Sequence, residues 1–370
     1  MKNIFNDIYK NKKILITGHT GFKGSWLSLW LTILGAEVIG FSLEPNTYPN
    51  MFNVLGLEKH LTSIKGDIRN KESLEKLLNK YKPDFIFHLA AQPLVRFSYQ
   101  EPLLTFETNI MGTINLLEAV RKSNFEGVVI NITSDKCYEN NEQQKNDNRF
   151  KENDPMGGYD PYSASKGASE IVSSAYRNSF FNPKNYSLSH KVALASARAG
   201  NVIGGGDWAE DRLVPDIVRA LYENKEIIIR NPHAIRPWQH VIECISGYLT
   251  LGAKLFENPI EYSEGWNFGS DENSTMTVEE IILKSLELWG CGTYKIIPEK
   301  IMKEAAFLKL DIGKAKEKLG WHPVYDINSS LEKTINWYKN YYFQQADMFD
   351  FTKNQLEDYA KIISSINLSR

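Results

Sequence analysis

The segment KILITGHTGFKGSWLSLWLTIL, residues 13–34, decides the fold. An apolar, strand-like run over 13–17 is followed by a helix-forming apolar stretch over 22–34, and three glycines recur between them: Gly18, Gly21 and Gly24. Glycines at this spacing let the backbone turn tightly, approach a diphosphate and pack a helix closely on a strand. The start of the helix then offers free N–H groups and partial positive charge. The segment therefore predicts a dinucleotide-binding loop.

The strand–helix alternation continues through the first half of the chain. We expect further strands at 37–41, 84–88, 127–132 and 193–197, and helices at 71–81 and 105–122. Continuous apolar strands between helices are typical of a parallel sheet that is covered on both faces. The pattern predicts an α/β fold with a Rossmann-type, doubly wound parallel sheet.

After about residue 205 the alternation loosens into short strands, helices and many aromatic residues. We interpret this part as a smaller, mixed C-terminal lobe that binds substrate at the carboxyl edge of the sheet, where ligands of open parallel sheets bind. We expect the dinucleotide-binding domain over residues 1–200, with contributions from later segments, and the substrate-binding lobe over 201–345. Residues 346–370 would form a polar tail, to which we assign no chemistry.

Composition excludes several classes of protein. With 370 residues, 42% hydrophobic, 24% charged and a net charge of −2, the chain is typical of a globular protein without nucleic acid or an anionic membrane as partner. Residues 25–43 are apolar enough to suggest a membrane span, but Gly35 and Glu37 interrupt them and favour a buried helix followed by a buried strand. The N-terminus has no signal-peptide pattern.

The cysteines and histidines do not predict a disulfide or a metal site. Cys137, Cys244 and Cys291 are scattered and odd in number, which favours a reducing, cytoplasmic location. His233 and His240 share a segment, but no further ligand accompanies them at metal-binding spacing.

Other residues of the cofactor region are less usual. His19, Phe22 and Lys23 occupy the glycine loop, and Lys23 could pair with a phosphate or be a solvated surface lysine. Ser42 stands at the end of the strand expected over 37–41, where an acidic residue would normally hold the adenosine ribose, with Glu44 two residues on. No neighbouring arginine would accept a 2′-phosphate, so the sequence favours NAD over NADP.

Two further groups of residues indicate catalysis. Tyr162 and Lys166, in PYSASK, share one face of a helix, and a lysine charge lowers the pKa of a nearby phenol. Ser134, Asp135 and Lys136 follow a buried strand and could bind a substrate, donate a proton and remove one. An ordinary surface pair and a polar strand cap are the alternatives, but both groups follow a dinucleotide loop and together favour hydride transfer.

The chain resembles the extended short-chain dehydrogenase/reductase family that acts on nucleotide-linked sugars, over about residues 13–323. The resemblance rests on the glycine loop and on HLAAQPLVR (88–96), NITSDKCY (131–138), PMGGYDPYSASKG (155–167), RAGNVIGGGDW (198–208) and IRPWQHV (235–241). Beyond the loop and PYSASK, these segments favour the branch that dehydrates CDP-linked glucose.

The resemblance implies specific roles. The glycine loop would bind the pyrophosphate, and other cofactor contacts would come from Asp67 and Ile68 at the adenine, Leu89, Ala90 and Ala91 beneath the cofactor, and Asn109 behind them. Ser134 and Tyr162 would hydrogen-bond the sugar 4-hydroxyl. The remaining substrate ligands would be Gln92, Asn201, Arg212, Leu213 and Arg236.

The resemblance also implies a reaction. With tightly held NAD, the sugar would be oxidised at C4, lose water across C5–C6 and be reduced at C6, in making deoxysugars for a surface polysaccharide such as lipopolysaccharide O-antigen. One departure matters, because related dTDP-glucose dehydratases carry Asp followed by a Glu base, where this chain has Asp135 and Lys136. A lysine base must be partly neutral.

Two alternative functions remain at this point: an NAD-dependent nucleotide-sugar epimerase, which shares the loop and the Tyr/Lys pair, and a non-catalytic NAD sensor that binds a partner protein. Relatives of this kind also imply a homodimer, through the helices of 105–122 and Tyr162, or a tetramer.

Overall fold

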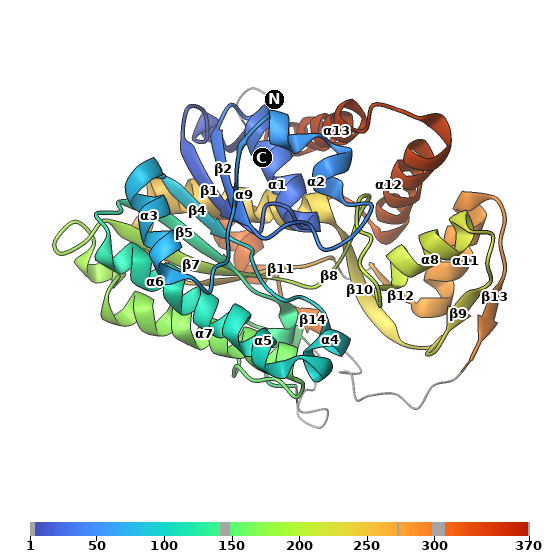
Figure 1. Cartoon of the computed structure of the whole chain (residues 1–370), viewed down its shortest axis with the longest axis horizontal. Coiled ribbons are helices and arrows are strands. Elements are labelled where there is room, and N and C mark those ends of the chain that lie inside the picture. Colours follow the sequence, from blue (N-terminus) through green and yellow to red (C-terminus); the bar gives the residue numbers. More distant parts are fainter. Residues whose placement is uncertain (1–3, 141–148, 272–273, 298–307, 369–370) are drawn as a thin grey trace.

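The structure is a computed structural model that describes residues 4–140, 149–271, 274–297 and 308–368. Its centre is a seven-stranded sheet with the order β11-β7-β5-β4-β1-β2-β3, and every neighbouring pair is parallel (Figure 1). The α/β, Rossmann-type class predicted from the sequence is confirmed. The strands are β1 (Lys13–Thr17), β2 (Glu37–Ser42), β3 (Thr62–Lys65), β4 (Phe85–His88), β5 (Gly127–Ile132), β7 (Val192–Ala199) and β11 (Gly265–Phe268).

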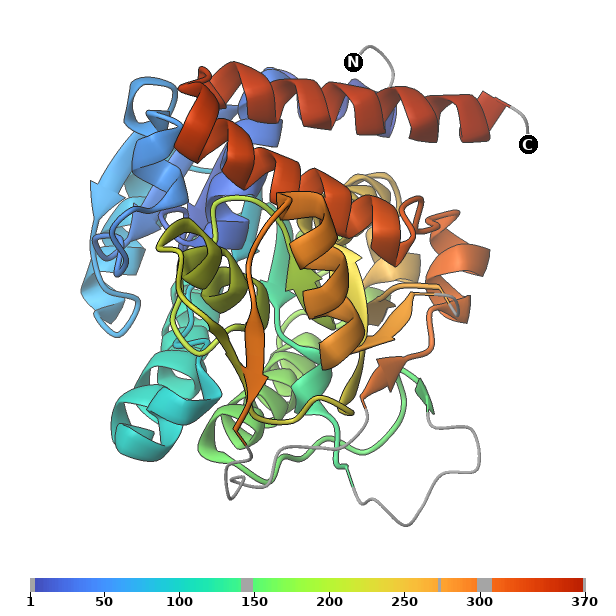
Figure 2. The same cartoon turned by 90° about the vertical axis from the view of Figure 1, so that its right-hand side faces the viewer.

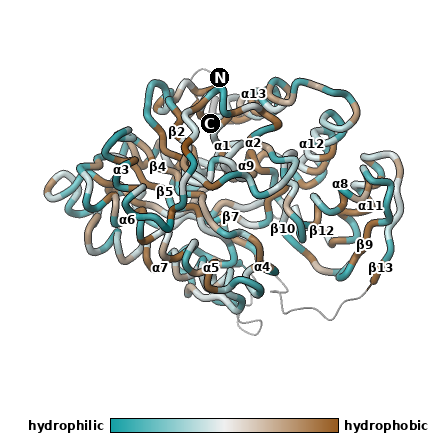
Figure 3. Tube along the Cα trace, viewed as in Figure 1, coloured by the Kyte–Doolittle hydropathy of each residue, from teal (hydrophilic) through white to brown (hydrophobic). Residues whose placement is uncertain are grey.

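Helices cover both faces of this sheet. Alternate strand residues enter two separate apolar clusters, so that Leu15 packs with one layer of helices and Ile14 with the other. The strands form the apolar interior in Figure 3. One layer holds α3 (Lys71–Tyr81), α6 (Gly112–Lys122) and α7 (Pro161–Ser179); the other holds α1 (Phe22–Ile33) and α9 (Val241–Glu257), with α13 (Met348–Leu368) outside α1.

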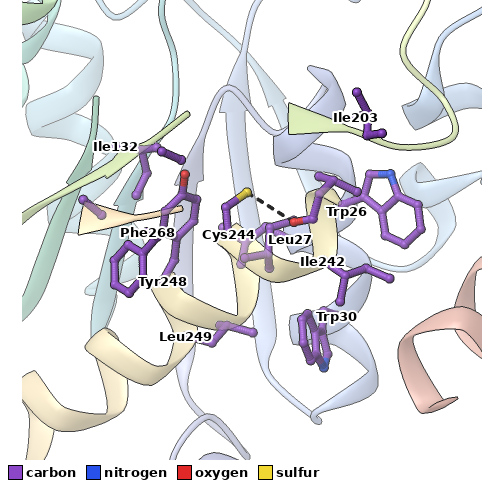
Figure 4. Packing of buried hydrophobic residues seen from close by; sticks show 14 of the residues in the cluster. Trp26, Leu27, Trp30, Ile132, Ile203, Ile242, Cys244, Tyr248, Leu249 and Phe268 are labelled. Carbon is purple, nitrogen blue, oxygen red and sulfur yellow. Dashed lines mark hydrogen bonds between the residues drawn. The ribbon is translucent and has the colours of Figure 1, made fainter. Parts of the chain in front are cut away.

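Fully buried large side chains lie where α1 meets α9. Trp26 and Trp30 of α1 are completely buried beside Ile242 and Leu249 of α9 (Figure 4). The indole nitrogen of Trp26 donates to the Gly205 carbonyl at 2.9 Å, which ties this core to the chain leaving the sheet. Residues 25–43 are thus a buried helix and strand, and no helix in the described ranges is long and apolar enough to cross a bilayer.

A smaller group of elements lies beside the carboxyl edge of the sheet, on the right of Figure 1. It begins directly after β7, with only Gly200 between β7 and β8. Its elements are the sheet β8 (Asn201–Ile203), β10 (Ile235–His240) and β12 (Thr275–Thr277), the pair β9 (Ile227–Ile229) and β13 (Tyr294–Ile296), and the helices α8 (Leu213–Tyr222), α11 (Val278–Trp289) and α12 (Ile327–Lys339). Short elements elsewhere are α2 (Met51–Val54), α4 (Val95–Gln100), α5 (Pro102–Phe106), α10 (Pro259–Tyr262), and the pair β6 (Arg149–Phe150) and β14 (Lys309–Leu310).

The helix expected over 105–122 is interrupted. A π-helical turn, Glu107–Met111, separates α5 from α6 and places Asn109 inside the protein. Such turns are frequent at functional sites, and their extra residue leaves no mark on an apolar repeat. Two strands also gave no clear signal: β3 is a mostly exposed edge strand, and β11 has only four residues.

The segment expected to be a polar tail contains a long helix, α13; residues 369 and 370 lie outside the described residues. Figure 2 shows α13 running across the molecule. Its polar sequence carries a buried face that includes Leu356 and Tyr359. The Tyr359 hydroxyl donates at 2.7 Å to Glu243 of α9, whose other carboxylate oxygen accepts the N–H groups of Val324 and Tyr325 at 2.9 and 2.6 Å.

Replacing Glu243 with Gln should remove a pH-dependent part of the stability. Burial raises the pKa of Glu243 to about 7, so its neutral form stabilises the fold below the ordinary pKa of 4.5 and this contribution is lost as the pH rises through 7. The unfolding free energy of the wild type minus that of Glu243→Gln should fall by about 3 kcal/mol between about pH 4.5 and pH 8. Urea denaturation followed by tryptophan fluorescence measures this difference. Glu58→Gln, at an exposed glutamate, should show none of it, and an equal change there would contradict the assignment.

Candidate active site

The glycine loop between β1 and α1 is built by close backbone contacts. A side chain on Gly18, whose φ is +79°, would lie 2.7 Å from the backbone nitrogen of Ala90, and one on Gly24 would lie 2.1 Å from the Gly18 carbonyl oxygen. A side chain on Gly21 would meet only the Gly18 oxygen, at 3.4 Å. Gly18 and Gly24 therefore allow the tight packing, while Gly21 leaves the backbone open on the side where a diphosphate could approach.

The side chain of His19 turns away from this open side. It is 1% exposed, its Nε2 lies 2.8 Å from the Ser63 hydroxyl, and its ring fills the space that Gly40 leaves by lacking a side chain. Burial lowers the pKa of His19 to about 4, so the imidazole is neutral. Only the backbone of His19 is left to contact a ligand.

The end of β2 carries hydroxyl groups where the sequence lacked an acidic residue. Ser42 Oγ and Thr20 Oγ1 lie 2.8 Å apart, and Thr20 also donates to the Leu43 carbonyl at 3.0 Å. Glu44 pairs with Lys65 at 3.0 Å on the surface. Thr20 is a residue that the sequence analysis did not single out, because a threonine in a turn carries no recognisable signal.

The predicted adenine end contains an arginine that the sequence analysis overlooked. Arg69 Nη2 forms an ion pair with Asp67 Oδ2 at 2.6 Å, and Arg69 Nη1 forms another with Glu107 Oε2 at 3.4 Å. These residues line an open depression of ≈ 620 Å³. Ile68 is buried against Gly112. The charge of this arginine is matched by the two carboxylates.

Beneath the loop, β4 continues into residues 89–92. The buried ring of His88 lies 2.7 Å from Thr17 Oγ1, and burial lowers its pKa to about 3. Asn109, in the π-helical turn, accepts the Gln92 N–H at 2.8 Å and donates to the Gln92 carbonyl at 3.0 Å. This fixes the path of the half-buried Leu89, Ala90 and Ala91. The Gln92 amide donates to Leu94 and Thr105, so its geometry favours shaping this turn, and its role as a substrate ligand stays a prediction.

The predicted catalytic triplet follows β5 as a short helical turn over Asp135–Cys137. The Ser134 hydroxyl donates to Asp135 at 2.9 Å and accepts the backbone N–H of Lys136 at 3.3 Å. Asp135 is 4% exposed, while Lys136 is half-buried. Burial raises the pKa of Asp135 although Lys136 and Ser134 oppose this, and a carboxyl group with a raised pKa is better suited to donate a proton.

The helix α7 places Tyr162 and Lys166 beside that turn. Asp160 caps the helix by accepting the Ser163 N–H at 2.9 Å, and the Tyr162 N–H donates to the Ser98 hydroxyl at 3.2 Å. Lys166 Nζ donates to the Ile132 carbonyl at 3.4 Å, at the end of β5. The two side chains are 8% and 6% exposed. The sequence DPYSASK thus provides the capping aspartate, a proline in the first turn and the buried polar face of the helix.

The electrostatics of this pair differ from the expectation. Burial raises the pKa of Tyr162 to about 12, whereas the sequence argument expected Lys166 to lower it. The groups that do lower it are Ser134, by a hydrogen bond, and the charge of Arg212. Burial and then the charge of Lys23 lower the pKa of Lys166 to about 8. The pKa of Tyr162 rises because the cost of removing its phenolate from water is larger than the stabilisation that neighbouring groups give to that phenolate.

The predicted substrate ligands surround the same edge. Arg212 precedes α8 and pairs with Asp207 at 2.7 Å, and its charge acts on Tyr162. Asn201 begins β8, beside Pro237, and Arg236 is half-buried on β10. Leu213 follows Arg212 as the first residue of α8. The structure therefore brings Lys23, Arg212 and the two predicted catalytic segments together. Arg236 donates from Nη1 to the Ile235 carbonyl at 3.0 Å.

Sequence reasoning missed a buried ion pair behind the catalytic residues. Glu170, one turn beyond Lys166, is bound by Arg198 at 2.9 Å and by hydroxyl groups of neighbouring strands. The sequence indicates this ion pair only by placing Glu170 four residues after Lys166, on the same face of the helix. Among the described residues, no group of three or more His, Cys, Asp and Glu side chains could hold a metal ion.

Comparison with known proteins places this geometry in a family. The profile of the GDP-mannose 4,6-dehydratase family matches residues 15–334. The CDP-glucose 4,6-dehydratase of Salmonella typhimurium is 49% identical over 357 residues, 96% of this chain and 98% of that protein. The CDP-paratose 2-epimerase of Salmonella typhi is 28% identical, over 88% of this chain and 98% of that protein.

Solved structures share the fold. The dTDP-glucose 4,6-dehydratase of Streptomyces venezuelae, with NAD bound, has a TM-score of 0.74 and 23% identity, over 90% of this chain and 100% of that chain. The dTDP-glucose 4,6-dehydratase of Bacillus anthracis, also with NAD, has a TM-score of 0.72 and 22% identity, over 92% and 99%. With a matching profile and a close full-length relative, the chain belongs to the GDP-mannose 4,6-dehydratase family of extended short-chain dehydrogenases/reductases.

Proposed function

We propose that this protein converts CDP-glucose to CDP-4-keto-6-deoxyglucose and water, with NAD as its cofactor. The observation that carries the proposal is the placement of Asp135 and Lys136, an acid and an amine, beside Tyr162 and Lys166 at one edge of the sheet. The similarity to a CDP-glucose 4,6-dehydratase over nearly the full length supports the CDP-linked substrate. The product would enter the synthesis of deoxysugars for a surface polysaccharide such as an O-antigen.

The residues present fit NAD. Gly18 and Gly24 provide the tight turn, and Gly21 leaves the backbone accessible at the start of α1. Ser42 and Thr20 offer hydroxyl groups toward the ribose, and Asp67 and Ile68 stand at the adenine end. Leu89, Ala90 and Ala91 would form the floor, fixed by Asn109. When bound, NAD⁺ supplies a hydride acceptor at C4 and returns the hydride at C6, so that no external oxidant is needed.

The chain's own residues perform the proton transfers. Tyr162, assisted by the Ser134 hydroxyl, takes the proton from the 4-hydroxyl, and Lys166 beside it supplies positive charge. The 4-ketone makes the hydrogen on C5 acidic. Lys136 removes that proton, and Asp135, whose pKa burial raises, protonates the leaving 6-hydroxyl as water departs. C5 is reprotonated when C6 receives the hydride, which completes the 4-keto-6-deoxy sugar. Arg212 and Arg236 would hold the diphosphate, with Asn201, Leu213 and Gln92 around the nucleotide sugar.

We also propose that the enzyme acts in the cytoplasm and pairs with a second copy. Large apolar side chains are exposed on the helices near Tyr162: Leu103 at 69%, Met111 at 47% and Ile171 at 57%. They lie on α5, the π-helical turn and α7. Exposed apolar groups that share one surface favour a protein interface.

Gly24→Ala should weaken NADH binding by roughly tenfold or more, because its new methyl group would overlap the Gly18 carbonyl oxygen. Gly21→Ala should also weaken binding, because its methyl group would cover the backbone that faces the diphosphate, but its contact of 3.4 Å inside the protein should leave the melting temperature of the free protein near that of the wild type. Gly24→Ala should lower that melting temperature as well as the affinity. Fluorescence titration with NADH and thermal unfolding without it measure the two effects. Equal melting temperatures in the two variants would contradict the assigned roles of the glycines.

A CDP-glucose labelled with deuterium at C4 should give a product that carries the label at C6, because the hydride taken at C4 is returned there. Mass spectrometry should show loss of one water, and NMR should locate the label. Tyr162→Phe should slow this turnover by about 100-fold or more. A product without loss of water and with the label at C4 would instead indicate an epimerase.

Lys136→Met should bind CDP-glucose normally but lose elimination by about 100-fold or more, because no base is left for C5. Unlabelled CDP-glucose should then yield NADH in a single turnover without forming the 6-deoxy product. Lys12→Met is the matched control and should keep full turnover, because it removes a half-buried lysine that pairs with Asp84 at 3.4 Å just before β1, away from the carboxyl edge of the sheet. Full turnover by Lys136→Met would show that another group is the base.

A further inference from the structure

The buried carboxylate of Glu170 collects four hydrogen-bond donors. Arg198 donates from Nε and Nη2, each at 2.9 Å, Ser196 donates from its hydroxyl at 2.6 Å, and Thr133 donates to the other oxygen. Glu170 and Arg198 are 3% and 4% exposed. A buried ion pair is stable only when its remaining hydrogen bonds are satisfied, and here both oxygens of the carboxylate are.

The arginine extends the contacts to the other side of the catalytic turn. Arg198 Nη1 donates to the Tyr138 hydroxyl at 2.6 Å and to the Glu152 carbonyl at 2.9 Å. The Tyr138 hydroxyl donates to Asn267 at 2.7 Å. Gly265 leaves room for the guanidinium, since a side chain there would lie 2.5 Å from it. The ion pair therefore contacts the residues on both ends of the Asp135–Cys137 turn.

Two polar side chains of α7 hold the end of β5, which goes beyond the stabilisation of the buried ion pair itself. Lys166 and Glu170, four residues apart on α7, share one helix face. Lys166 donates to the carbonyl of Ile132, and Glu170 accepts from the side chain of Thr133. Two adjacent residues at the end of β5 thus hold two successive turns of α7, which fixes both the shift and the rotation of the helix.

We propose that Glu170 is a positioning residue for the reaction: through Thr133 it sets the register of α7 against the end of β5, and so the fit of Tyr162 to Ser134 and Asp135. The inference rests on the proposed function. Ser134 directly follows Thr133, and Lys166 precedes Glu170 by one turn, so each end of this contact lies within one turn of a catalytic segment. A misplacement of such groups by about 1 Å can cost about 100-fold in rate.

The test compares two hydroxyl groups on the same carboxylate. Thr133→Val removes the donor that leads into the catalytic turn, and Ser196→Ala removes the matched donor on β7, which leads away from it. Thr133→Val should lower kcat for CDP-glucose about tenfold with KM unchanged, and Ser196→Ala should change kcat less than about threefold. Both should lower the melting temperature similarly. Thr133→Ser, which keeps the hydroxyl, should restore kcat.

Equal losses of kcat in Thr133→Val and Ser196→Ala, or no rescue by Thr133→Ser, would show that the ion pair only stabilises the fold. A second measurement needs no substrate: amide hydrogen exchange over residues 161–166 should rise in Thr133→Val and stay near wild type in Ser196→Ala. If the wild type fails to dehydrate CDP-glucose, the proposed function falls while this exchange difference still decides the positioning role. The absence of that difference would overturn the role.

Discussion

The carbonyl oxygen of Gly18 occupies the space that a side chain at residue 24 would need, and this contact seats α1 on β1. Because of it, the N-terminus of α1 opens at the carboxyl edge of the sheet. All seven strands run in parallel, so their carboxyl ends meet at that same edge. The segments after β4, β5 and β7 and the start of α7 therefore converge on one region. The position of the site therefore follows from this one close contact and from the parallel direction of the strands.

Burial is the main electrostatic influence in that region. It raises the pKa values of Asp135 and Tyr162 and lowers that of Lys166, which moves each group toward its neutral form. A raised pKa suits the acid role that we propose for Asp135. The raised pKa of Tyr162 opposes the base role that we propose for it, so Ser134 and Arg212, which lower that pKa, become correspondingly important. The Tyr/Lys pair alone, as interpreted from the sequence, does not bring the pKa of Tyr162 below its ordinary value.

The sequence predicted what local pattern can encode. β1, β5 and α3 have the bounds expected from apolar runs, and the loop, the helix of Tyr162 and the turn of Asp135 lie together as the motifs implied. It did not predict contacts between distant residues. Nothing in the repeat of α6 marks the π-helical turn that turns Asn109 toward Gln92, and nothing near Glu107 shows that Arg69, 38 residues earlier, would reach it. The buried face of α13 was hidden because its partner, Glu243, lies over 100 residues away.

The unusual residues of the glycine loop also make sense only in three dimensions. His19 is bulky for such a loop, but it fills a space that Gly40 on β2 leaves, and its ring contacts Phe52 edge-on at 5.2 Å. The histidine thus belongs to the packing between the loop, β2 and α2. With Ser42 in place of an acidic residue, no carboxylate ends β2, and the charge of Glu44 is shared with Lys65. At the neighbouring adenine end, the charge of Arg69 is likewise shared, with Asp67 and Glu107, so neither end leaves a charge without an opposite charge beside it.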